Sequence, residues 1–391
     1  MKRMEYVQLG DLIAATKTNR CGDNDFPVLS ITKNEGIILQ SEKFKKRIAS
    51  KDTADYKVVH RGQLVQGIHI DEANFGIQEV VDIGIVSPAY KIWDIKSNAI
   101  VPKYLEIILR SPRSIAYYAS RFNGSIKRRE RLSDKDFLQM KIPCPPVAEQ
   151  IYAIEVLDKA AVLIEQRKQQ LMELDNLIKA RFVEMFGDVI HNNKSWKMHV
   201  FADIASSRLG KMLDAKQQTG KCSYPYLANF NVQWFRFNIE NLNQMDFDED
   251  DRAELELKDG DLLVCEGGEI GRCAVWHNEI QPCFFQKALH RVRCNRQIIH
   301  PDYLAWWFKY NCDHDGFAAI AGAKATIAHL PGVKLKQLQV AVPPLELQQQ
   351  FASFVEQVDK SKVAEATHTL CTLFNIILNG GTRYDIRTNE F

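Results

Sequence analysis

Clusters of lysine and arginine are the residues of this chain whose chemistry is simplest to state, because cations bind the phosphates of nucleic acids. The densest cluster is Lys127-Arg128-Arg129-Glu130-Arg131. Arginine in such a segment could also pair with the O6 and N7 atoms of guanine in the major groove. DNA contact and a solvated charged loop both fit this cluster, in which the candidate DNA-contact residues are Lys127, Arg128, Arg129 and Arg131.

Other cations stand in segments with turn or strand character, where an exposed surface is the alternative to DNA contact. The glycine-rich turn 266–271 precedes Arg272, and a structural turn is the favoured interpretation there. Two aromatic groups, 234–237 and 306–308, are interpreted as core more readily than as base-stacking surfaces. The further candidate DNA contacts are Lys43, Lys45, Lys46, Arg47, Arg272, Lys287, Arg291, Arg293 and Lys324.

The motifs of catalysis are missing from the sequence. A DNA adenine methyltransferase needs an Asp/Asn/Ser-Pro-Pro-aromatic motif to hold a flipped adenine. The two Pro-Pro pairs here read Cys144-Pro145-Pro146-Val147 and Val342-Pro343-Pro344-Leu345. The sequence has no G-x-x-x-x-G-K-[ST] phosphate loop and no evident glycine-rich loop for S-adenosylmethionine. We therefore expect no catalytic residues and no cofactor on this chain.

The composition is that of a folded protein with room for two globular domains. The chain has 391 residues, 46% of them apolar and 26% charged, with a net charge of +2. Its nine cysteines include no C-x-x-C pair and are expected to be reduced thiols. The segment Cys312-Asp313-His314-Asp315 is interpreted as a helix end and not as a metal site. No signal peptide or membrane span is recognised, so a cytoplasmic location is expected.

An internal repeat organises the chain. Gly124 and Gly322 lie 198 residues apart, and so do Pro145 and Pro343. The segment 59–65 matches 257–263, and 9–13 resembles 201–205, while the first halves of the two copies have diverged most. Short β-type runs early in each copy precede a helix that begins near Pro102 or Pro301. Two divergent copies of one mixed α/β unit are therefore expected.

A long helix is expected after each Pro-Pro pair. The stretch from Val147 to about Phe186 has no proline or glycine and would span ~60 Å. The second helix is expected from Leu345 to about Leu378, with Asn379-Gly380-Gly381 as its stop. Apolar residues at seven-residue steps predict a coiled-coil seam between the two helices. The seam residues are Leu157, Ile164, Leu171, Ile178, Val363, Leu370 and Ile377.

At this point the sequence resembles the family of type I restriction-modification DNA specificity subunits over nearly its whole length. The segments 145–150 and 343–351 are similar to the Pro-Pro-Leu-x-Glu-Gln opening of that family's two long helices. The segment 182–188, Phe-Val-Glu-Met-Phe-Gly-Asp, resembles a frequent end of the central helix. Leu347 stands where the motif has glutamate, which departs from the pattern in the second copy.

The resemblance implies an α+β fold with two target-recognition domains separated by two long antiparallel coiled-coil helices. Each domain would read half of an asymmetric sequence in double-stranded DNA. The implied partners are two methyltransferase subunits, which methylate adenine at N6, and two restriction subunits; S-adenosylmethionine, ATP and magnesium would be bound by those partners. The expected segments are 1–146 and 188–344 for the recognition domains, 147–187 and 345–379 for the helices, and 380–391 for the tail.

Two other functions fit parts of the sequence. A self-contained DNA adenine methyltransferase could carry similar recognition domains, although its motif is missing. A coiled-coil adaptor would account for the helices but would not bind duplex DNA in a salt-dependent way. If the helices set the distance between the two half-sites, one heptad added to the central helix would lengthen the unread spacer by about three base pairs.

Overall fold

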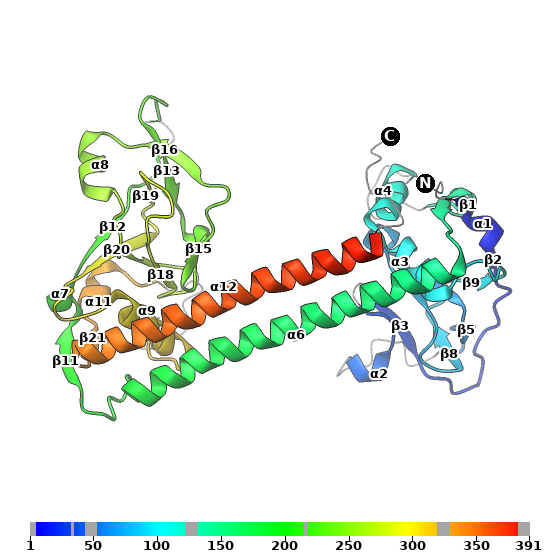
Figure 1. Ribbon diagram of the computed structural model, residues 1–391, viewed down its shortest axis with the longest axis horizontal. Helices are drawn as coiled ribbons and strands as arrows, with labels where there is room; N and C mark the ends of the chain where they lie inside the picture. Colours follow the sequence, from blue (N-terminus) through cyan, green and yellow to red (C-terminus); the bar gives the residue numbers. More distant parts are fainter. Residues whose placement is uncertain are drawn as a thin grey trace. The chain divides into compact units, whose positions relative to one another are not determined.

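The computed structural model describes residues 5–32, 35–43, 53–121, 132–214, 218–318 and 329–381, without the side chains of residues 71 and 364–381. The chain divides into two compact units (Figure 1). Unit 1 comprises Met1–Gln166 and Thr369–Phe391, and unit 2 comprises Arg167–His368. The boundary between the units therefore falls within each of the two long helices.

Unit 1 is built on an antiparallel four-stranded sheet with the order β2-β9-β6-β7. Phe75 and Trp93 lie 5.5 and 5.3 Å from the ring of Phe137, so one aromatic core joins the sheet to the helices after it. The elements are β1 (Tyr6–Gln8), α1 (Leu9–Leu12), β2 (Ile13–Ala15), β3 (Leu29–Thr32), β4 (Gly36–Leu39), α2 (Gln40–Lys43), β5 (Lys57–His60), β6 (Leu64–Gln66), η1 (Ile70–Glu72), β7 (Phe75–Ile77), β8 (Ile83–Val86), β9 (Lys91–Ile95), α3 (Pro102–Leu109), α4 (Pro112–Arg121), α5 (Asp134–Gln139), β10 (Lys141–Pro143) and the first half of α6 (Val147–Phe186).

Unit 2 contains an antiparallel four-stranded sheet with the order β12-β20-β17-β18 and a three-stranded sheet with the order β16-β13-β19. Its elements are β11 (Lys197–Val200), α7 (Phe201–Ile204), β12 (Ala205–Leu209), β13 (Ser223–Leu227), η4 (Asn229–Asn231), β14 (Val232–Gln233), β15 (Arg236–Phe237), β16 (Asn243–Asp246), α8 (Glu249–Leu255), β17 (Leu262–Cys265), β18 (Cys273–Val275), β19 (Phe284–Phe285), β20 (Leu289–Cys294), α9 (Pro301–Asp313), α11 (Gly332–Lys336), β21 (Gln339–Val342) and α12 (Leu345–Gly381).

The two units share one topology, which confirms the predicted repeat. In each four-stranded sheet the strands, taken in chain order, are arranged first, fourth, second, third. A short helix precedes each first strand, and a two-stranded pair, β1-β10 or β11-β21, ends at the long helix. The first halves differ as expected, because unit 1 has the pairs β3-β4 and β5-β8 where unit 2 has the three-stranded sheet.

A buried glutamine gives the repeated Pro-Pro motif its structural role. In unit 1 the N–H of Val101 donates to Gln150 Oε1 (2.8 Å), and Gln150 Nε2 donates to the carbonyls of Ala99 and Pro145 (both 2.7 Å). The side chain is fully buried. It ties the start of α6 to the start of α3, and so fixes how the long helix leaves the domain.

Unit 2 repeats this arrangement with Gln348, which is also fully buried. Its Oε1 accepts from the N–H of His300 (2.8 Å), and its Nε2 donates to the carbonyls of Ile298 (3.1 Å) and Pro343 (2.8 Å). The same three bonds therefore connect α12 to α9. The final glutamine of the motif is required because one amide supplies both the acceptor and the donors.

Within unit 2 the two long helices pack antiparallel. The ring centroids of Phe182 in α6 and Phe351 near the start of α12 lie 5.4 Å apart. Arg167, which is earlier in α6, donates to the carbonyl of Lys362, which is later in α12 (3.1 Å). The ammonium of Lys362 lies 2.8 Å from a carboxylate oxygen of Asp175. Figure 1 shows α12 running beside α6 along this part of the chain.

The seam is shifted from the predicted one. Ile178 is buried, Leu171 is half-buried, and Leu157, Ile164 and Val363 are exposed, at 48%, 45% and 68%. The last three positions are thus outside the buried stripe, which corrects the prediction. A straight α-helix drifts by about 20° in each heptad from a strict seven-residue repeat, so residues three heptads apart do not keep one face. The predicted Leu370 and Ile377 have side chains outside the described residues.

The helix limits follow the sequence closely. Both α3 and α9 begin at the predicted proline, and α6 spans Val147–Phe186 as expected. Helix α12 ends at Gly381, three residues later than predicted, because the Asn-Gly-Gly segment forms its last turn instead of following it. Helix α9 ends at Asp313, within the Cys-Asp-His-Asp segment, as predicted.

Membrane-crossing helices and clusters of metal ligands are both absent from the described residues. Their helices include none that is both long and apolar enough to cross a membrane. Their histidines, cysteines and carboxylates form no group of three or more that could hold a metal ion.

Candidate nucleic-acid interface

Several of the predicted cations lie outside the described residues. These are Lys45, Lys46, Arg47, Lys127, Arg128, Arg129, Arg131 and Lys324. Lys43 is described, at the end of α2, and its ammonium lies 2.6 Å from a carboxylate oxygen of Glu35. This exposed pair leaves Lys43 accessible to a phosphate, but the cation already has a local partner.

Arg291 and Arg293 are held by acceptors inside unit 2. They share one face of β20 because side chains two residues apart point the same way. Arg293 makes a two-point contact with Asp261, at 2.7 Å (Nε) and 3.1 Å (Nη2). Arg291 is 8% exposed and donates to the carbonyl of Glu254 at the end of α8. Arg291 thus connects β20 to the end of α8, and Arg293 connects it to the segment that follows α8.

The Arg293–Asp261 pair gives a stability prediction. Replacing Arg293 by methionine should lower the free energy of unfolding by roughly 3 kcal/mol, because the Asp261 carboxylate would stay buried without its cation. Arg208→Met is the matched control, since Arg208 pairs with Glu254 at the surface and its loss should cost less than about 1 kcal/mol. Urea unfolding of the full chain measures both. Equal costs would contradict a structural role for Arg293.

Arg272 closes the glycine-rich turn, as the favoured interpretation predicts. Its guanidinium donates to the carbonyl of Asn229 (3.0 Å) and lies 3.2 Å from Glu269. Gly271 has a φ of +78°, and a Cβ there would come within 3.1 Å of Cys312 Sγ, so glycine is required. The turn is thereby fastened to η4, and Arg272 is occupied by internal acceptors.

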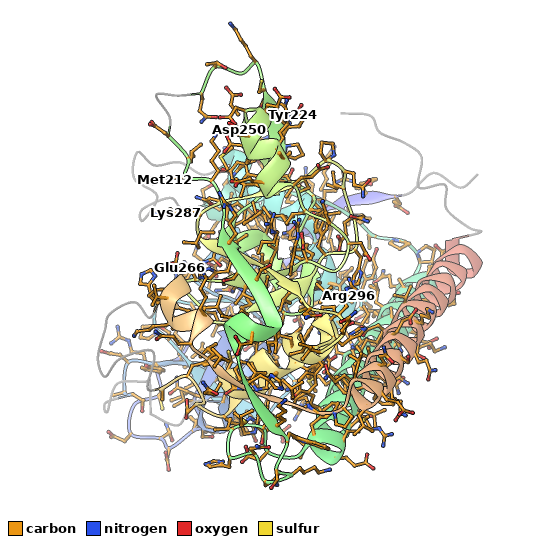
Figure 2. All side chains as sticks on the ribbon, turned by 90° about the vertical axis from the view of Figure 1, so that its left-hand side faces the viewer. Met212, Tyr224, Asp250, Glu266, Lys287 and Arg296 are labelled. Carbon is orange, nitrogen blue, oxygen red and sulfur yellow. The ribbon has the colours of Figure 1, made fainter. Side chains whose placement is uncertain are left out.

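Lys287 differs from the arginines. It is exposed, in the turn between β19 and β20, and among the described residues its ammonium has no carboxylate partner. Its Nζ lies 3.9 Å from the sulfur of Met212. Figure 2 shows both residues at the same edge of unit 2. Of the predicted cations that are described, Lys287 is thus the one most available to an external anion.

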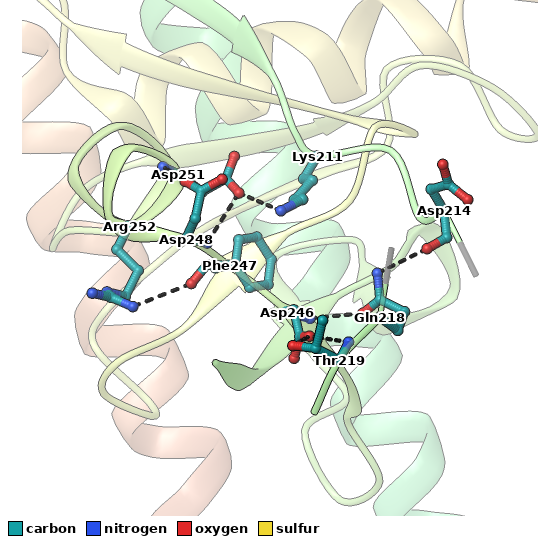
Figure 3. Close-up of polar contacts among 9 residues, drawn as sticks. All are labelled: Lys211, Asp214, Gln218, Thr219, Asp246, Phe247, Asp248, Asp251 and Arg252. Atoms are coloured by element: carbon teal, nitrogen blue, oxygen red, sulfur yellow. Dashed lines mark hydrogen bonds and ion pairs between the residues drawn. The ribbon is translucent and has the colours of Figure 1, made fainter. Parts of the chain in front are cut away.

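The segment that carries Met212 is fastened at both ends (Figure 3). Lys211 forms an ion pair with Asp251 of α8 and lies 5.5 Å from the ring of Phe247. At the other end, Asp246 accepts from the hydroxyl of Thr219 (2.7 Å) and the N–H of Gly220 (2.8 Å). Gln218 connects the two ends, because its Nε2 donates to the carbonyl of Asp214 and its Oε1 accepts from the N–H of Asp246.

These hydrogen bonds act on the ionised form of Asp246. Those from Thr219 are the largest influence, and they hold the pKa of Asp246 below its usual range. The contribution of this carboxylate to stability is therefore present above its pKa in the unfolded chain and is lost as the pH falls through its lowered pKa. Sequence reasoning missed Asp246, Lys211 and Met212, since their partners are distant in the chain.

The aromatic groups are mostly core, as predicted. Trp306, Trp307 and Phe308 are buried in α9. Phe235 differs: it is 37% exposed, has a φ of +61°, and stacks on Trp306 with 4.3 Å between ring centroids. Phe235 therefore extends the aromatic core to the surface, and its main contact is packing against Trp306.

Comparisons with known proteins agree with this geometry. A family model described as the type I restriction modification DNA specificity domain matches residues 193–369, which is most of unit 2. The chain is thus similar to type I restriction-modification specificity subunits. The resemblance inferred from its Pro-Pro motifs is confirmed.

Two relatives of this specificity-subunit family show the extent of the sequence match. The putative type I restriction enzyme MjaX specificity subunit of Methanocaldococcus jannaschii is 25% identical over 170 residues, which cover 42% of this chain and 40% of the relative. The type I restriction enzyme EcoKI specificity subunit of Escherichia coli K12 is 20% identical over 235 residues, 56% of this chain and 50% of the relative. The matches thus span half or less of the relatives' length.

A similarity of fold extends over nearly the whole chain. A solved structure described as showing complex assembly and conformational transition of the type I R-M system superposes with a TM-score of 0.61 at 15% identity, and covers 97% of this chain and 96% of that one. This likeness concerns the fold alone. It confirms the predicted mixed helix and strand architecture with its long helices.

Proposed function

We propose that this chain is the non-catalytic DNA-recognition subunit of a type I restriction-modification complex, acting in the cytoplasm. The observation that carries the proposal is the duplication: two units of one topology, of which the second matches a DNA specificity domain. Two similar domains are suited to reading two separate half-sites, since the symmetry of a protein is reflected in the spacing of the sites it reads. Each unit would read one half of an asymmetric target.

The partners of the proposed complex are two methyltransferase subunits, which methylate adenine at N6, and two restriction subunits for ATP-dependent cleavage. S-adenosylmethionine, ATP and magnesium would be bound by them. To these partners helix α6 offers exposed apolar side chains, which are otherwise costly to leave in water. In the part of the helix that belongs to unit 2, Met172 and Val183 lie near one face and are 55% and 44% exposed.

The structure gives the Pro-Pro pairs a use other than catalysis. Pro145 and Pro343 each supply a carbonyl to the buried glutamine at the start of a long helix. A methyltransferase would need the residue before its Pro-Pro to reach a flipped adenine. Here that residue is Cys144, which is buried, or Val342, which is also buried. This favours recognition over self-contained methylation.

The test is a genome-wide map of N6-methyladenine in a host without other modification systems. We expect a split motif when this chain is expressed together with its methyltransferase subunit, and no methylation when either is expressed alone. Methylation by this chain alone would overturn the non-catalytic role. If the pair methylates nothing and the purified pair shows no salt-dependent binding to duplex DNA, a structural adaptor becomes the better explanation.

A further inference from the structure

The loop of unit 2 that contains Met212 crosses the β19–β20 turn at very short range. The N–H of Lys211 donates to the carbonyl of Phe285 (3.1 Å), and the N–H of Lys287 donates to the carbonyl of Lys211 (2.9 Å). A Cβ on Gly210 would lie 2.2 Å from the carbonyl oxygen of Phe285, so only glycine fits at the crossing. Two segments about 75 residues apart in sequence thus form one rigid edge.

This edge exposes an unusual combination of side chains. Met212 is 63% exposed and Leu213 is 45% exposed, although both are apolar and the loop that carries them is hydrogen bonded at each end. Beside them stands the ammonium of Lys287. Lys211 is neutralised by Asp251, so among the described residues of this edge Lys287 supplies the free positive charge. A cation next to apolar side chains is suited to DNA, where phosphates flank the apolar faces and methyl groups of the bases.

We propose that Lys287 and Met212 form a DNA-contacting edge of unit 2, in which the ammonium binds a backbone phosphate and the methionine packs against neighbouring bases. This inference rests on the proposed function and assigns one half-site to particular residues. Asp246 is a positioning residue: it touches no DNA, but its carboxylate holds Thr219 and Gly220. Its backbone N–H binds Gln218, whose amide donates to the carbonyl of Asp214, two residues after Met212.

The experiment uses the complex of this chain with its methyltransferase subunit. Two readouts are measured: the methylated motif in cells, and the binding of the purified complex to its own target at several salt concentrations. Lys287→Gln should weaken binding on the order of fivefold and lower the slope of log affinity against log salt by about one, as expected for one lost phosphate contact. Met212→Ala should relax the bases accepted in one half of the motif and leave the other half unchanged.

Lys197→Gln is the matched control, because Lys197 is an exposed lysine of the same unit on β11. It should behave as the wild type does. If Lys287→Gln and Met212→Ala also match the wild type, the inference is wrong while the proposed function stands. If the wild-type complex neither methylates a motif nor binds DNA, the proposed function fails and this inference fails with it.

The positioning role of Asp246 is tested separately. Asp246→Ala should relax the same half of the motif as Met212→Ala does, whereas Asp246→Asn keeps an acceptor at the same place and should restore most of the selectivity. The slope of the salt dependence should stay at its wild-type value in both variants, because neither removes a phosphate contact. An unchanged motif with Asp246→Ala would overturn this role, and a loss in both halves would show a general folding defect in place of positioning.

Discussion

A seven-residue insertion in both long helices is expected to lengthen the unread spacer of the target by about three base pairs. One heptad adds about 10 Å to a helix, and one base pair takes up about 3.4 Å of duplex. Both helices must be extended because they pair within unit 2, where Arg167 of α6 contacts Lys362 of α12. Suitable places are residues 155–166 of α6 and 365–376 of α12, which are helical and which precede Phe182 in α6 and follow Phe351 in α12.

The register of the insertion provides the control. Seven residues turn a helix by about −20°, so the buried stripe stays on nearly the same face, whereas five residues turn it by about 140°. Five-residue insertions in both helices should therefore abolish methylation by breaking the pairing. The methylated motif is mapped for each variant in cells with the methyltransferase subunit. A seven-residue variant that methylates with the original spacer would show that the helices do not set the distance.

The repeat and the helices could be predicted because their signals are local. Pro102 and Pro301 mark helix starts by their own backbone geometry, and the stretch from Val147 to Phe186 lacks both glycine and proline. A constant offset between two sets of landmarks needs no knowledge of contacts. These features therefore appear in the structure at nearly the expected residues. The seam of the long helices was displaced because a strict heptad and a straight helix differ in period.

The roles of the cations could be predicted only in part. The spacing of Arg291 and Arg293 places both side chains on one face of β20. Their acceptors are in α8 and at Asp261, which are distant in sequence. Lys287 precedes the strand, and this position in a turn is the sequence signal that could have separated it from the two arginines. The crossing beneath Met212 depends on the pairing of β12 with β20 and on the bridge between Lys211 and Gln286, which no local pattern encodes. The contacts of Asp246 depend likewise on a long-range pairing, that of β13 with β16.

Gln348→Leu is expected to destabilise unit 2 by about 3 to 5 kcal/mol. Leucine fills a similar volume, but the N–H of His300 and the carbonyls of Ile298 and Pro343 lose their partner, and each buried unsatisfied group costs roughly 1 to 3 kcal/mol. The neighbouring Gln349 is exposed, so Gln349→Leu is the matched control and should change stability by less than about 0.5 kcal/mol. Urea unfolding of the full chain measures the difference.

Hydrogen exchange shows where the loss occurs. Gln348→Leu should reduce protection in β11, β21 and the start of α9, with unit 1 unchanged, and Gln150→Leu should do the converse in β1, β10 and α3. Because Gln150 and Gln348 make the same three bonds in the two copies, their costs should agree within about 1 kcal/mol. If only one of the two substitutions lowers the free energy of unfolding strongly, the glutamine stabilises that copy alone. The same three hydrogen bonds in the other copy would then contribute little to its stability.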